Sequence, residues 1–117
     1  MSLSKEDMYP HVRKQLQKWY PENRGWKILA RNEVPGVQPD FLIEKETGER
    51  IERSFCAVEV VKLITEDHLK RMRHYMDILS GQNVSILEHI LAVPSGTDTS
   101  SVPQGVSVLR IPHVHVD

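Results

Sequence analysis

The stretch that decides the fold is Gln38-Pro39-Asp40-Phe41-Leu42-Ile43, followed after a polar turn by Phe55-Cys56-Ala57-Val58-Glu59-Val60-Val61-Lys62. Each half places one carboxylate at the edge of an apolar run that is typical of a buried β-strand. The polar connection between the halves contains a glycine and has the length of a hairpin loop. A buried carboxylate is costly unless it is paired with a cation. The stretch therefore predicts a hairpin whose two strands carry a candidate metal site for phosphate chemistry.

The bulk composition indicates one globular domain. The chain has 117 residues, of which 39% are hydrophobic and 26% charged, and these are values of folded domains rather than of disordered chains. The net charge of −1 excludes a general attraction to DNA or to anionic membranes, so binding to DNA would depend on a local patch. The single cysteine, Cys56, excludes an internal disulfide and favours a reducing, cytoplasmic location. No apolar stretch approaches the ~20 residues of a membrane span, so no membrane partner is expected.

The first helix is predicted from Ser4 to Tyr20, because its apolar residues recur every three to four positions. Ser4 followed by Asp7 resembles a capping box. Pro10 leaves two possibilities open, since proline disfavours a helix interior. Either the helix begins near Tyr9, or it begins at Ser4 and bends.

The rest of the chain predicts five strands and a second helix. Thr65 is the expected cap of that helix and Gly81 its stop, and a long surface loop is expected from residue 94 to 105. A strand–helix–strand passage within one sheet needs a crossover, so the sheet should be mixed. The result is an α/β domain of order αβββαββ, with a mixed sheet of about five strands and helices on both faces. The strands are expected at 26–30, 41–43, 50–61, 90–93 and 106–111.

This element order, with Pro39-Asp40 before one strand and Glu59 in Val58-Glu59-Val60, resembles the PD-(D/E)xK nuclease superfamily, which has the restriction-endonuclease-like fold. The superfamily includes Holliday-junction resolvases and the N-terminal nuclease domains of type I restriction subunits. The resemblance covers nearly the whole chain. It implies a single nuclease-like domain, residues 1–117, that hydrolyses phosphodiester bonds in DNA with Mg²⁺ or Mn²⁺.

The resemblance also implies roles for individual residues. Asp40 and Glu59 would be the metal ligands, with the Val60 carbonyl a possible third, because Mg²⁺ prefers hard oxygen ligands. The metal would activate water and stabilise charge on the phosphate oxygens. Lys62 would be the catalytic lysine that orients or deprotonates the water. Glu6 corresponds to an acid often found on the first helix of the family.

One departure from the family pattern concerns the lysine. The family has acid-x-lysine, whereas here Glu59 and Lys62 are three residues apart, so a regular strand would point them to opposite faces. Three possibilities stay open. A β-bulge at Val60-Val61 would bring Lys62 round, Lys70 on the next helix would replace it, or the domain has lost catalysis and serves as a nucleic-acid-binding or protein-interaction module.

The second helix carries the residues expected to contact DNA, Lys70, Arg71 and Tyr75. Arg71 and Tyr75 have the i, i+4 spacing that places two side chains on one face, and an arginine can bind a phosphate in a bidentate manner. Small members of the family commonly pair, so a homodimer is a further expectation. His113 and His115 have a spacing that can chelate a metal, although no third ligand lies near them in the sequence.

Overall fold

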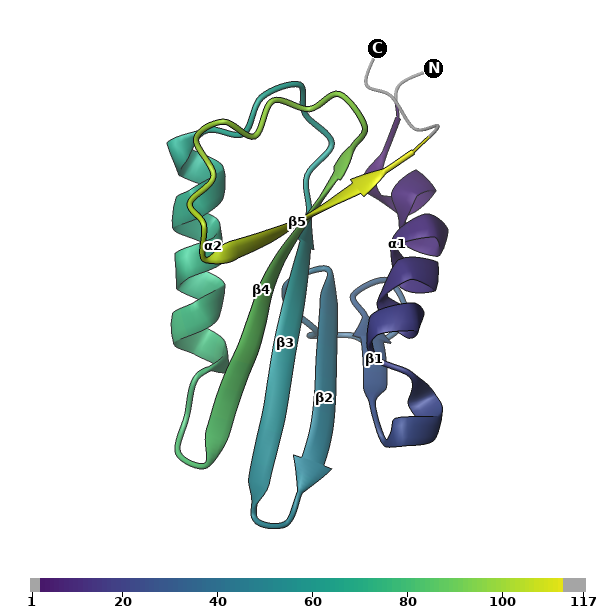
Figure 1. Cartoon of the computed structure of the whole chain (residues 1–117), viewed down its shortest axis with the longest axis vertical. Helices are drawn as coiled ribbons and strands as arrows, with labels where there is room; N and C mark the ends of the chain where they lie inside the picture. Colours follow the sequence, from purple (N-terminus) through teal and green to yellow (C-terminus); the bar gives the residue numbers. More distant parts are fainter. Residues whose placement is uncertain (1–2, 113–117) are drawn as a thin grey trace.

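A computed structural model describes residues 3–112 of the chain. Its centre is a five-stranded mixed sheet of order β1-β2-β3-β4-β5, in which the first three strands are antiparallel and the last two run parallel to β3. Helix α1 (Lys5–Trp19) and helix α2 (Glu66–Leu79) lie on opposite sides of this sheet (Figure 1). The α/β class, the mixed sheet and the element order are those that the sequence predicts.

Helix α1 begins directly after Ser4 and includes Pro10. The Ser4 hydroxyl accepts a hydrogen bond from the Asp7 N–H, and the Asp7 carboxylate accepts one from the Ser4 N–H. This capping box places the start of the helix at Lys5. Of the two possibilities that Pro10 left open, the structure has the earlier start, and a short 3-10 turn η1 (Glu22–Arg24) follows the helix.

The antiparallel part of the sheet is the predicted hairpin with one more strand beside it. Strand β1 (Lys27–Ala30) pairs with β2 (Phe41–Thr47), which pairs with β3 (Arg50–Val58). Thr47 pairs with Arg50, so the turn has two residues, and its first, Gly48, has φ +65°. Glycine at this place suits a type II′ hairpin turn.

Helix α2 makes the crossover from β3 to the parallel strand β4 (Val84–Pro94), and a long loop, predicted at 94–105 and found at 95–105, leads to the edge strand β5 (Val106–Ile111). Strand β4 is longer than the sequence predicts. Helix α2 ends at Leu79 with Ser80 as its C-cap, and Gly81, the predicted stop, is not among the described glycines with a positive φ. None of the helices within residues 3–112 is long and apolar enough to cross a membrane.

Each face of the sheet is covered by one helix and has its own core. Alternate residues along β3 point to opposite faces, so Cys56 and Val58 belong to the core under α1, whereas Phe55 and Ala57 belong to the core under α2. Both cores exclude water from the centre of β3. The two predicted carboxylates lie at one end of the antiparallel pair of β2 and β3, Asp40 directly before β2 and Glu59 directly after β3.

The main difference from the sequence prediction is the end of β3. The expected strand reaches Val61, but the strand ends at Val58, and Glu59 directly follows it. The register of β3 against β4 shifts between Arg53 and Phe55, well before Val60-Val61, where a bulge was one of the three possibilities. The segment after Glu59 is tied instead to the loop after β4, since the Thr97 hydroxyl donates to the Val61 carbonyl and the Asp98 N–H to the Lys62 carbonyl.

Candidate functional site

Asp40 is a buried carboxylate at the start of β2, with only 2% of its surface exposed. Its Oδ1 accepts a hydrogen bond from the Tyr9 hydroxyl at 2.5 Å, and its Oδ2 accepts one from the Val58 N–H at 2.7 Å. Backbone pairing of β2 with β3 stops at Phe41. The Val58 N–H therefore donates to the Asp40 carboxylate instead of to a backbone carbonyl of β2. Burying a charge is tolerated when such donors replace water.

Tyr9 positions Asp40 from helix α1. Its ring packs edge-on against Phe41, with the ring centroids 5.1 Å apart. Burial, and after it the hydrogen bond to Asp40, raise the pKa of the Tyr9 phenol above its ordinary range. Tyr9 therefore stays a neutral donor to the carboxylate.

Glu59 lies directly after β3 and remains attached to the sheet, because its N–H donates to the Ala92 carbonyl at 3.0 Å. Its side chain is 13% exposed. The carboxylate is thus held at the end of the central strand, close to the N-terminal ends of both helices.

Lys5 joins the two carboxylates. Its Nζ lies 3.5 Å from Asp40 Oδ2 and 3.9 Å from Glu59 Oε1. Because one ammonium contacts both side chains, Asp40 and Glu59 face the same site rather than opposite faces of the sheet. Lys5 comes from the first turn of α1, which the capping box at Ser4 holds in place.

An imidazole and a guanidinium of α2 lie near the other carboxylate oxygen of Glu59, Oε2. His68 Nε2 lies 3.4 Å and Arg71 Nη2 3.5 Å from Glu59 Oε2. His68 Nδ1 accepts a hydrogen bond from the Thr65 N–H at 2.9 Å, so the proton of a neutral His68 is on Nε2, facing Glu59. The two acids are therefore surrounded by Lys5, His68 and Arg71.

Lys62, the lysine predicted for catalysis, is exposed and follows the end of β3 by four residues. Within residues 3–112, the recorded ion pairs of Asp40 and Glu59 involve other side chains. The structure thus brings Lys5, and not Lys62, to the carboxylates. The physical reason is that the strand ends before Val60, so no bulge turns Lys62 round.

Glu6 is exposed and lines a cavity of about 230 Å³ between α1 and the segment after β1. Tyr9 lines the same cavity, and the negative charge of Glu6 contributes to the raised pKa of Tyr9. Among the described contacts, none joins Glu6 directly to Asp40 or Glu59.

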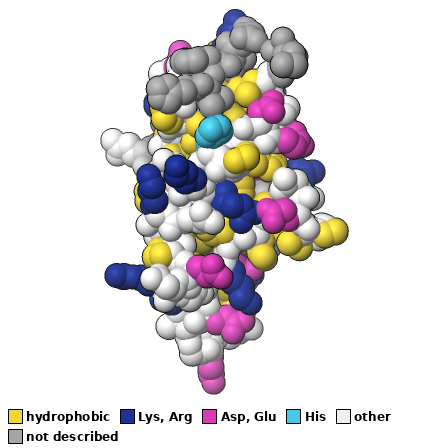
Figure 2. Space-filling model, turned by 90° about the vertical axis from the view of Figure 1, so that its right-hand side faces the viewer, with side chains coloured by type: hydrophobic (Ala, Val, Ile, Leu, Met, Phe, Trp, Pro, Cys, Tyr) yellow, Lys and Arg dark blue, Asp and Glu magenta, His cyan; other side chains and the backbone are white. Residues whose placement is uncertain are grey.

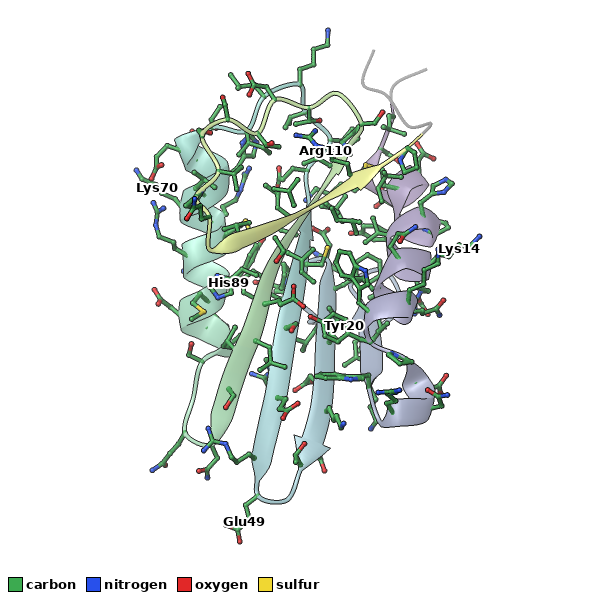
Figure 3. All side chains as sticks on the ribbon, viewed as in Figure 1. Lys14, Tyr20, Glu49, Lys70, His89 and Arg110 are labelled. Atoms are coloured by element: carbon green, nitrogen blue, oxygen red, sulfur yellow. The ribbon has the colours of Figure 1, made fainter. Side chains whose placement is uncertain are left out.

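The three residues predicted to contact DNA point in different directions. Arg71 turns toward Glu59, whereas Tyr75 packs edge-on against Phe55 at a centroid distance of 6.3 Å. Lys70 is exposed and lies on the side of α2 that is turned away from the sheet (Figure 3). Only Arg71 of the three is part of the site.

The donor set suits a hard cation only in part. Two carboxylates are enough for Mg²⁺, which commonly keeps water and substrate phosphate as its remaining ligands. Within residues 3–112, no group of three or more His, Cys, Asp or Glu side chains is arranged as a metal site. Lys5 also contacts both acids, so a metal ion would fit here if the ammonium moved aside. The pair His113 and His115 lies outside the described residues.

Sequence reasoning missed three residues of this site, Lys5, Tyr9 and His68. The spacing between Lys5 and Tyr9 is i, i+4, which places both on one face of α1, and this was the available signal. His68 lies in the first turn of α2, and no sequence pattern around it indicates a contact with Glu59. Their contacts to the acids join segments far apart in the chain.

Comparison of the chain with models of protein families, with curated proteins and with solved structures gives no match. A function for the chain is therefore inferred from the site itself.

Proposed function

We propose that this chain is a small nuclease-like domain that hydrolyses phosphodiester bonds in DNA, with Mg²⁺ or Mn²⁺ bound by Asp40 and Glu59. The observation that carries the proposal is the convergence of both carboxylates on the Lys5 ammonium, at 3.5 and 3.9 Å. A position that attracts one ammonium from two acids also attracts a metal cation. The fold supports the proposal at the level of the α/β class and of the element order αβββαββ, which is the order that the resemblance is based on.

Each residue of the site has a part in this proposal. A bound metal would supply an activated water and stabilise charge on the phosphate oxygens. Tyr9 and the Val58 N–H orient Asp40 as a ligand, and the Val60 carbonyl is a further proposed ligand. Arg71, more than half exposed, is placed to donate to a substrate phosphate. Lys5 supplies the positive charge that the family pattern assigns to Lys62.

The charge distribution limits how DNA would be bound. On the face that carries α1, basic and acidic side chains are interspersed (Figure 2). Helix α2 exposes Lys70, Arg71 and Arg73, but it also exposes acidic side chains in the same helix. We therefore expect weak, salt-sensitive binding in which the site, rather than a broad basic surface, determines where the phosphate lies.

The test is a cleavage assay on linear and branched DNA with Mg²⁺ or Mn²⁺. We expect wild-type protein to cleave at least one of these substrates and Asp40→Asn to lose roughly 10²–10⁴-fold of the rate, since one metal ligand and its charge are removed. Asp77→Asn is the matched control, because Asp77 is an exposed carboxylate on α2. Cleavage that is equal in wild type and Asp40→Asn contradicts the proposal.

A second function is favoured by one observation. Both acids already have protein partners: Asp40 contacts Tyr9, the Val58 N–H and Lys5, while Glu59 contacts Lys5, His68 and Arg71. A domain that had lost catalysis would keep such a neutralised cluster for stability and would act as a binding module. Wild-type protein that neither cleaves DNA nor binds Mn²⁺ would support this second function.

A further inference from the structure

The contacts of Lys5 have an unusual geometry for an ion pair. A strong N⁺–H···O⁻ hydrogen bond has a length of ~2.7–2.9 Å, whereas Lys5 Nζ lies at 3.5 and 3.9 Å from its two oxygens. The ammonium is thus shared between the acids instead of being bound tightly to one. Its side chain is 39% exposed, so it has room to move toward solvent.

The four oxygens of the two acids divide into two sets. Asp40 Oδ1 is held by Tyr9, and Glu59 Oε2 is approached by His68 and Arg71. Asp40 Oδ2 accepts a hydrogen bond from the Val58 N–H at 2.7 Å and also faces Lys5, as Glu59 Oε1 does. Asp40 and Glu59 would hold a metal ion in the region where the ammonium now lies, because that is where a cation is attracted by both acids.

We infer that Lys5 is a built-in competitor of the metal ion at this site. Two positive charges cannot occupy the position between Asp40 and Glu59 together, because at such short range their repulsion is large. Metal binding therefore requires displacement of Lys5, and the ammonium sets the metal concentration at which the site fills. The inference rests on the proposed function and adds the regulation of that site by the chain itself.

The test measures Mn²⁺ binding by isothermal titration calorimetry, together with thermal melts over a range of Mn²⁺ concentrations. Lys5→Met keeps the length of the side chain and removes its charge. We expect it to bind Mn²⁺ about 10-fold more tightly than wild type, as the loss of one partly screened repulsion implies. Lys14→Met is the matched control, because Lys14 is exposed on the outer side of the same helix (Figure 3), and it should bind Mn²⁺ as wild type does.

Lys5→Arg tests the same inference in the opposite direction. A guanidinium can donate to both carboxylates at once and is harder to displace, so this variant should bind Mn²⁺ at least as weakly as wild type. It also keeps the charge balance of the site, and so remains informative if Lys5→Met does not fold.

The outcomes separate the inference from the proposed function. If wild type cleaves DNA with Mn²⁺ but Lys5→Met binds the metal no more tightly than wild type, the competition is wrong and the proposed function stands. If Mn²⁺ neither binds nor stabilises wild type or Lys5→Met, both are wrong. Tighter binding in Lys5→Met, abolished by adding Asp40→Asn, supports the competition at this site.

Discussion

At the scale of single residues, Asp40 depends on three donors from two elements, α1 and β3. The hydroxyl of Tyr9 comes from α1, the N–H of Val58 from β3 and the ammonium of Lys5 from the first turn of α1. Removing one donor from a buried carboxylate leaves a charge without full compensation, which costs more than the hydrogen bond itself contributes.

Tyr9→Phe should therefore destabilise the protein by about 1–3 kcal/mol, the range for leaving a buried polar group without its partner. Urea denaturation at pH 7 measures the change. Tyr75→Phe is the control, since the ring of Tyr75 packs against Phe55 and no hydrogen bond of its hydroxyl is recorded among the described residues. Equal losses in the two variants would contradict the role given to Tyr9.

A second prediction for single residues concerns which lysine, Lys5 or Lys62, takes part in the proposed reaction. Lys5 is the lysine that contacts both acids in the described residues, so at saturating Mn²⁺ we expect Lys5→Ala to lower the rate of DNA cleavage by roughly 10²–10⁴-fold. Lys62→Ala should change the rate little, because Lys62 is exposed beyond the end of β3. A severe loss in Lys62→Ala alone would return the catalytic role to the residue that the sequence predicts.

At the scale of elements, the start of α1 is what places Lys5. Ser4 and Asp7 form the capping box, and the hydrogen bonds from Ser4 lower the pKa of Asp7 below its ordinary value. A lowered pKa in the folded state means that this contribution to stability is present above about pH 4 and is lost as the pH falls and Asp7 takes up a proton.

Ser4→Ala should cost about 0.5–2 kcal/mol at pH 7, the usual loss for an N-cap, and the difference from wild type should shrink below about pH 4. Chemical denaturation at several pH values between about 2.5 and 7 checks both expectations, because this interval includes the ordinary pKa of an aspartate. Gln17→Ala, an exposed change in the same helix, should stay within about 0.5 kcal/mol of wild type. A loss in Ser4→Ala that does not depend on pH would contradict the hydrogen bond from the Ser4 hydroxyl to the Asp7 carboxylate, since the variant keeps the Ser4 N–H that bonds the same carboxylate.

At the scale of the whole molecule, the two cores keep titratable groups neutral. Burial raises the pKa of the Cys56 thiol above its ordinary value of 9.0. Burial, and after it the hydrogen bond to Glu88, raise the pKa of Tyr20 above its ordinary value of 10.0. In the unfolded chain these groups lose their protons at lower pH than in the folded protein.

The contribution of these two groups to stability should therefore be complete at neutral pH and fall progressively as the pH rises above about 9, because the unfolded state then binds fewer protons than the folded state. Urea midpoints between about pH 8 and 11 measure the slope. Tyr20→Phe should start from a lower stability, since its hydrogen bonds to Ser54 and Glu88 are lost, but should show a shallower fall. An unchanged slope in this variant would contradict the assignment.

The sequence by itself determined the kind and the order of the elements of this protein, because their signals are local. Apolar periodicity, the caps at Ser4 and Thr65 and the short polar turn at Gly48 depend on residues close together in the chain. The placement of Asp40 and Glu59 at the edges of apolar strands was predictable for the same reason.

Only the tertiary structure decided what surrounds the two acids. The end of β3 depends on its hydrogen bonds to the loop after β4, so the sequence pattern could not show that Lys62 falls outside the strand. The approach of Lys5 to both carboxylates depends on how α1 packs across the end of the sheet, over a separation of 35 residues from Asp40. Local patterns specify which face a side chain occupies, but contacts between distant segments are set by the packing of the two cores.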